Sequence, residues 1–198
     1  MKSLCLISTV LLTLFSAAAL AQHDHASQTA PAAPSEAQKS FEALKGLAGT
    51  WEGTLTPVPP VKNFGGARVK VVIRVTSKGN ALMHEMTIAG LPDDPITMLY
   101  LDGDRLMLTH YCDMGNRPRM AGKLSPDGKT VAFEVLDISG STQRGHMADA
   151  VFTVVDADHH TEEWASVMPG GKRMLGRYDL KRTKEASGAF GEAIQKKP

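Results

Sequence analysis

Short β-rich segments separated by tight turns run through most of this chain of 198 residues. Gly, Pro, Asn and Asp recur between them, as in Ser77-Lys78-Gly79-Asn80 and Ser125-Pro126-Asp127-Gly128, and these residues favour tight turns. No segment of helix length separates any two of the β-rich segments, so a parallel sheet, which needs long crossovers, is excluded. The pattern predicts an antiparallel meander of ten strands, at 50–57, 67–76, 81–89, 95–101, 104–112, 117–124, 130–137, 148–155, 159–168 and 172–182.

Several of these strands have one apolar and one polar face. Val69, Val71, Ile73 and Val75 alternate with polar residues, and the following strand places His84 on its apolar face. An open sheet of ten strands would leave two unpaired edges and a bare apolar face, and closure removes both. We therefore predict a mostly β fold, a ten-stranded antiparallel up-and-down β-barrel with a short N-terminal helix. A two-sheet sandwich is the alternative.

The short helix is predicted just before the first strand. Ser35-x-x-Gln38 has the form of a capping box. Phe41 and Leu44 then give an apolar stripe at helical spacing, and Gly49 is a typical stop. The pattern predicts a helix of about three turns that packs on a larger body.

The N-terminus has the features of a secretory signal peptide. Lys2 is followed by an uncharged stretch from Leu4 to Leu20, which ends in the small-x-small sequence Ala19-Leu20-Ala21. Ser and Thr dilute this stretch, whereas a membrane anchor needs a more continuous apolar run. We expect cleavage of residues 1–21, no membrane span afterwards, and a periplasmic or secreted protein that begins at Gln22.

The rest of the chain divides into three parts. Residues 22–34 are rich in Ala, Pro, Ser and Gln and are expected to be a disordered linker; 35–182 form the barrel domain and 183–198 a flexible tail. Loss of Lys2 from the 22 basic residues leaves a number equal to the 21 acidic ones, so no excess positive charge favours a nucleic-acid partner. Cys112 is then the one cysteine left, which excludes an internal disulfide.

The junction Gly49-x-Trp51-x-Gly53, placed after a short helix, resembles the start of the lipocalin and fatty-acid-binding (calycin) superfamily. It is most similar to the nitrobindin branch, whose members have ten strands and bind haem. The resemblance implies an arginine on the last strand that lies across the tryptophan, and Arg177 and Arg182 are both candidates, with Arg177 preferred. A guanidinium on an indole contributes about 0.5–2 kcal/mol, so Trp51 and its arginine are expected to close one barrel end.

The same resemblance implies haem bound through a histidine near the C-terminal strands. No histidine follows His160 in this chain, and Met174 and Tyr178 are less suitable ligands on the last strand. The cofactor therefore stays unknown at this stage, with haem as an alternative.

One hairpin, from Thr109 to Met120, is unusually rich in functional groups. By strand alternation His110 and Cys112 share the face of Leu106 and Leu108 and are expected to face the interior. Two such residues do not complete a zinc site, so no metal ligand and no catalytic residue is assigned. The predicted ligand-binding residues are His84, His110, Tyr111, Cys112, Asn116 and Arg119.

These features favour an exported barrel that binds a small apolar or amphipathic molecule in its interior, oriented by the polar groups. Three alternatives stay open: a haem-binding nitrobindin-like protein, a small enzyme with His110 as acid–base, and a protein-interaction module. Catalysis is the less favoured interpretation, because the sequence has no recognisable catalytic triad.

Overall fold

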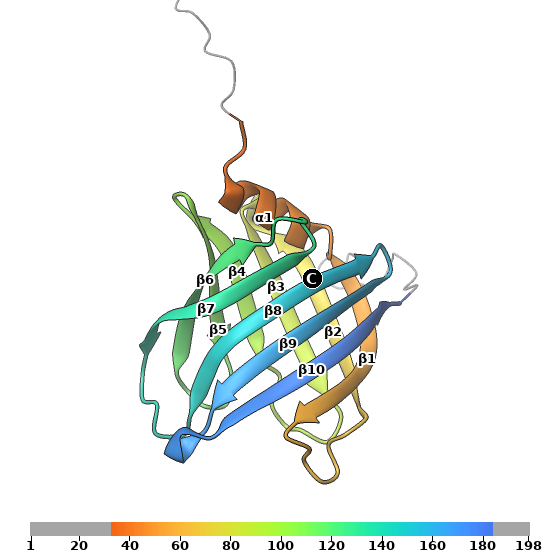
Figure 1. The fold of residues 1–198 in the computed structure, drawn as a ribbon, viewed down its shortest axis with the longest axis vertical. Helices are drawn as coiled ribbons and strands as arrows, with labels where there is room; N and C mark the ends of the chain where they lie inside the picture. The colour runs from red at the N-terminus through yellow and green to blue at the C-terminus, as the bar shows by residue number, and fades with distance from the viewer. Residues whose placement is uncertain (1–32, 184–198) are drawn as a thin grey trace, which may run out of the picture. The chain divides into compact units, whose positions relative to one another are not determined.

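Ten antiparallel strands close into a barrel in the order of the chain, as predicted (Figure 1). The computed structural model describes residues 33–183; the predicted signal peptide, most of the predicted linker and nearly all of the predicted tail lie outside them. The strands are β1 (Gly49–Val58), β2 (Ala67–Thr76), β3 (Ala81–Ile88), β4 (Ile96–Asp102), β5 (Arg105–Tyr111), β6 (Arg117–Leu124), β7 (Thr130–Ser139), β8 (His146–Asp156), β9 (His159–Val167) and β10 (Arg173–Arg182). Within 33–183, no helix is both long and apolar enough to cross a membrane.

Each strand pairs with its neighbours in the sequence, and β1 pairs with β10 to complete the barrel. Two short 3₁₀ turns, Ser77–Gly79 and Pro169–Gly171, follow β2 and β9. The strand bounds match the prediction to within about two residues, which is the usual spread at element ends. The predicted sandwich alternative is excluded, because the sheet has no open edge among the described strands.

The helix α1 (Glu36–Lys45) lies across one end of the barrel, against β4, β5 and β6 (Figure 1). Its capping box is present: the Gln38 N–H donates to Ser35 Oγ at 3.2 Å, and the Ser35 N–H donates to Gln38 Oε1 at 2.7 Å. Phe41 and Leu44 are buried in the hydrophobic core. The amphipathic pattern therefore produces a helical cover for this end.

Trp51 and Arg182 close the same end. Trp51 is fully buried, and its Nε1 donates to the Leu47 carbonyl at 2.8 Å. The Arg182 guanidinium lies 4.1 Å from the centre of the Trp51 ring. Arg182 also donates to the carbonyls of Ala48 at 2.7 Å and Gly46 at 3.2 Å. One side chain therefore joins the last strand to the segment between α1 and β1.

The preference for Arg177 was wrong. Arg182 is the direct cross-strand partner of Trp51, whereas Arg177 lies on the outer face, where it donates to Glu163 at 2.8 Å. The first glycine of the motif has a role in this contact, because a Cβ at Gly49 would collide with the Arg182 guanidinium.

We expect Arg182→Lys to lower the free energy of unfolding by about 2 kcal/mol, because lysine loses the planar stacking and the fork of N–H donors. The matched control Arg177→Lys should stay within about 0.5 kcal/mol of the wild type, since its ion pair is exposed. Urea unfolding followed by tryptophan fluorescence measures both. Equal losses in the two variants would contradict the assignment of Arg182.

Candidate functional site

The barrel contains a cavity of about 250 Å³ toward the end opposite α1. Its apolar wall comes from the end of β3, the β3–β4 connection and β8, with Met86, Ile88, Leu91, Pro95 and Met147. Its polar wall carries His84, Thr97, His110, Trp164, Ser166 and Tyr178. Asp93, Cys112, Asp113 and Met114 lie at the more exposed rim. The site thus combines an apolar chamber with a few polar groups, which is typical of small-molecule sites.

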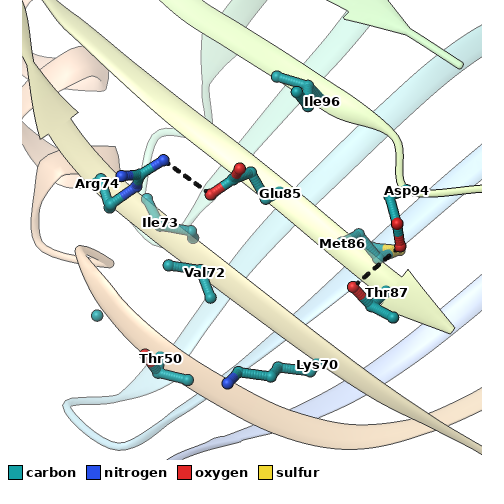
Figure 2. A pocket seen from close by; sticks show the side chains of 11 residues that line it. Thr50, Lys70, Val72, Ile73, Arg74, Glu85, Met86, Thr87, Asp94 and Ile96 are labelled. Carbon is teal, nitrogen blue, oxygen red and sulfur yellow. Dashed lines mark hydrogen bonds and ion pairs between the residues drawn. The ribbon is translucent and has the colours of Figure 1, made fainter. Parts of the chain in front are cut away.

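A larger hollow of about 620 Å³ lies on the outer face of β1–β4 (Figure 2). Two contacts join side chains of this lining: Arg74 pairs with Glu85 at 2.9 Å, and the Thr87 hydroxyl donates to Asp94 at 3.2 Å. The interior cavity is the better candidate despite its smaller size, because buried polar side chains, among them His110 and Tyr178, line it together with apolar ones.

A fully buried carboxylate, Glu162 of β9, organises the interior. His84 Nε2 of β3 lies 3.0 and 3.1 Å from its two oxygens, and His160 Nε2 lies 3.0 Å from Oε1. Trp164 Nε1 donates to Oε2 at 2.8 Å. Since β3 and β9 are not neighbours in the barrel, the His84–Glu162 contact spans the interior.

Burial alone would raise the pKa of Glu162, but the charge of His84 and the hydrogen bonds from His160 and His84 outweigh it. The pKa of this carboxyl is therefore well below its usual range, and Glu162 is ionised. An unpaired buried anion is costly, and the N–H groups of the two histidines and of Trp164 offset that cost by donating to the carboxylate. The Nδ1 atoms of both histidines are buried without a partner among the described residues.

His110 is a neutral hydrogen-bond donor toward the cavity. Burial, together with the charge of His84, lowers the pKa of His110 to about 4. Its Nδ1 lies 2.8 Å from Thr97 Oγ1, and Thr97 is buried with no other side-chain partner in the described part of the chain. The hydroxyl proton of Thr97 needs an acceptor, and because Nδ1 is its one hydrogen-bond partner among the described side chains, we assign that proton to the contact with Nδ1. The remaining ring proton is then on Nε2.

Tyr178 contributes a second donor from β10. Burial and the charge of Glu162 raise the pKa of Tyr178, so its phenol stays protonated. Its ring is largely buried in the cavity wall, where the hydroxyl lies beside Gly176 of the same strand, and this hydroxyl has no hydrogen-bond partner among residues 33–183.

The rim carries a small acidic cluster. Ligand atoms of Asp93, Cys112 and Asp113 lie within 4.8 Å of one another. The Asp113 N–H donates to Asp93 at 3.3 Å, and Arg144 pairs with Asp113 at 3.4 Å. Burial raises the pKa of Asp93 and of the Cys112 thiol. Cys112 is therefore not an activated thiolate.

Three of the six residues predicted to bind ligand line the cavity: His84, His110 and Cys112. Tyr111 does not, because it alternates with its two neighbours and its side chain is 44% exposed outside. The structure therefore brings together only the inward-facing half of the predicted hairpin cluster.

The other two predicted residues, Asn116 and Arg119, stabilise the barrel outside the cavity. Asn116 is buried and its Nδ2 donates to the carbonyls of Ser141 at 3.0 Å and Gly145 at 2.7 Å, which ties the β5–β6 turn to the β7–β8 connection. Arg119 lies on the outer face in a two-bond pair with Asp137. Neither side chain lines the cavity.

The sequence analysis missed Glu162, Trp164 and Tyr178. A signal was present, because His160-x-Glu162-x-Trp164 has the alternation of a strand face. A carboxylate on the same face as a tryptophan indicates a buried polar group that needs partners.

The residues present do not fit haem. β10 has no histidine. His84 and His160 use their Nε2 atoms on Glu162, and their Nδ1 atoms are buried, which leaves His110 as the cavity histidine with an accessible nitrogen. A volume of about 250 Å³ also lies below the range of about 300–1,000 Å³ for drug-sized ligands, and a porphyrin is larger still.

Comparison with known proteins gives fold likenesses only. No family model matches the sequence, and no curated protein matches it. The structure is similar to Rv2717c from M. tuberculosis, with a TM-score of 0.56, 15% identity, and coverage of 73% of this chain and 98% of that one. It is also similar to a protein of unknown function from the DUF3598 family of Nostoc punctiforme, with a TM-score of 0.51 and 12% identity. The match covers 71% of this chain and 49% of that protein, so this chain spans about half of its length.

We expect Glu162→Gln to lower the free energy of unfolding by about 3 kcal/mol or more at pH 7, because a buried charged pair loses its anion. The adjacent Glu163→Gln is the matched control, since Glu163 lies on the outer face with Arg177, and its effect should stay within about 0.5 kcal/mol. Urea denaturation of both variants measures the difference. Indistinguishable midpoints would contradict the role of Glu162.

The low pKa of His110 predicts a pH dependence of stability. Between pH 6.5 and about 4 the unfolded chain binds a proton at His110 that the folded chain does not, so stability falls as the pH decreases through this window, by up to about 3 kcal/mol. The variant His110→Asn should lose this component when unfolding is measured at several pH values. If both proteins show the same pH slope, His110 is not held neutral.

Proposed function

We propose that this chain is an exported β-barrel that binds a small, largely apolar molecule in its interior cavity. The observation that carries the proposal is the cavity itself, closed at one end by α1 and Trp51 and lined by apolar residues with a few inward polar groups. The signal-peptide pattern at residues 1–21 supports export to the periplasm or the medium.

The alternatives have less support. A haem-binding, nitrobindin-like role is consistent with the barrel but not with the cavity volume or the histidine positions described above. Acid–base catalysis by His110 requires a pKa near the working pH, whereas a pKa of about 4 leaves this imidazole deprotonated at neutral pH.

Native mass spectrometry of the protein purified from the exported fraction tests the proposal, together with an absorption spectrum from 250 to 700 nm. We expect a mature mass that begins at Gln22 and a co-purifying small organic mass. A Soret band would instead support the haem alternative. An apo mass, combined with no saturable NMR shift when α-methylstyrene is added as an apolar probe, would contradict the proposal.

A cavity-filling variant should remove binding. Ser166 faces the cavity from β9, so we expect Ser166→Phe to abolish the co-purifying mass or the probe shifts because the ring occupies the chamber. Thr54→Phe, on the exposed outer face of β1, is the matched control and should bind as the wild type does. Circular dichroism verifies that both variants fold. Binding that survives in Ser166→Phe would place the ligand elsewhere.

A further inference from the structure

We propose that the cavity recognises a neutral carbonyl group, whose oxygen accepts hydrogen bonds from His110 Nε2–H and Tyr178 Oη–H. This inference rests on the proposed function and names the chemical class of the ligand: a small apolar molecule with a ketone, aldehyde, ester or amide carbonyl.

The two donors face one cavity from opposite sides of the barrel. His110 is on β5 and Tyr178 is on β10, which lie five strands apart in the closed ten-strand order. A carbonyl oxygen has two lone pairs and accepts two hydrogen bonds. In the proposed complex, a ligand oxygen between the two walls accepts a hydrogen bond from each of these cavity-facing donors.

Below the rim carboxylates of Asp93 and Asp113, the polar side chains that face the chamber offer few free acceptors. The carboxylate of Glu162 already accepts from three side chains, and Thr97 uses its hydroxyl proton on His110. Ser166 donates to Met168 Sδ at 3.8 Å. A ligand that offers only donors would leave His110 and Tyr178 unpaired, and unpaired buried polar groups are costly.

The charge distribution favours a neutral ligand over an anion. No lysine or arginine lines the cavity, and the Nε2 atoms of His84 and His160 are both directed at Glu162 rather than at the chamber. The rim adds Asp93 and Asp113, of which Asp113 is paired with Arg144. A carboxylate in this chamber would lack a cation, and a buried unpaired charge costs far more than a neutral carbonyl.

Glu162 and His84 also keep His110 and Tyr178 in the protonation states in which they donate hydrogen bonds. The positive charge of His84 disfavours a proton on His110 Nδ1, and the negative charge of Glu162 disfavours loss of the Tyr178 proton. Glu162 and His84 are therefore positioning residues, which act on the ligand through the protonation of His110 and Tyr178.

Three probes of nearly equal shape test the proposal: acetophenone, α-methylstyrene, in which a CH₂ replaces the carbonyl oxygen, and benzoate, which is anionic. Dissociation constants come from NMR titration of the full mature protein, with the Trp164 indole N–H as a reporter inside the cavity. The ratio of the dissociation constants of two probes is compared between variants, because this comparison cancels the difference in hydrophobicity between the probes.

The decisive variant is Tyr178→Phe, which keeps the ring and removes a hydroxyl that has no described protein partner. We expect this variant to raise the dissociation constant of acetophenone about tenfold. The dissociation constant of α-methylstyrene should stay unchanged or decrease slightly. Tyr111→Phe is the matched control, since this tyrosine is exposed outside the cavity, and both probes should bind it as they bind the wild type. The carbonyl carbon of ¹³C-labelled acetophenone should also shift downfield on binding to the wild type and less so in Tyr178→Phe.

The outcomes separate the two proposals. If α-methylstyrene binds in the cavity but Tyr178→Phe affects both probes equally, the interior binding function stands and carbonyl recognition is overturned. Tighter binding of benzoate than of acetophenone would overturn it in favour of an anion site. If no probe produces saturable shifts of Trp164, the proposed function fails and the inference fails with it.

Discussion

A single buried anion organises the interior of this barrel. Glu162 receives N–H groups from His84, His160 and Trp164, and the His84 contact joins β3 to β9 across the chamber. Backbone pairing closes the wall strand by strand, but it specifies nothing about which side chains meet in the middle. The ion pair provides that specification, since a buried carboxylate tolerates few arrangements of its donors. The aromatic rings follow this arrangement: His84 and His110 lie 5.6 and 5.2 Å from Trp164, centroid to centroid.

The two ends of the barrel have different chemistry because different parts of the chain close them. At one end α1, Trp51 and Arg182 form a packed seal in which the guanidinium lies on the indole and donates to the carbonyls before β1. At the other end the β3–β4 connection and the β5–β6 turn carry acidic and thiol groups around an opening. The similarity to Rv2717c is one of fold.

Local sequence patterns predicted the barrel well, because turn chemistry and alternation are short-range properties. The same patterns predicted His84, His110 and Cys112 as inward residues, since each shares a face with apolar neighbours. They failed for Tyr111 and Arg119, which were grouped with His110 by closeness in sequence although adjacent residues in a strand face opposite sides. Local patterns could not predict the role of Glu162, because its partner His84 is 78 residues away in the sequence and only the closed topology brings the two together. Arg177 and Arg182 could not be separated for a similar reason, since the choice depends on the register between β1 and β10.

The sealed end has a kinetic consequence. With α1, Trp51 and Arg182 across one end, a molecule bound in the chamber as proposed would arrive and depart through the same opening, beside Asp93 and Cys112. A change that narrows this opening without touching the bound molecule must slow association and dissociation by the same factor, because both pass through one transition state. Residence time and affinity are therefore separately adjustable in this barrel: residues at the rim set how long a molecule stays, and residues deeper in the chamber set how tightly it is held.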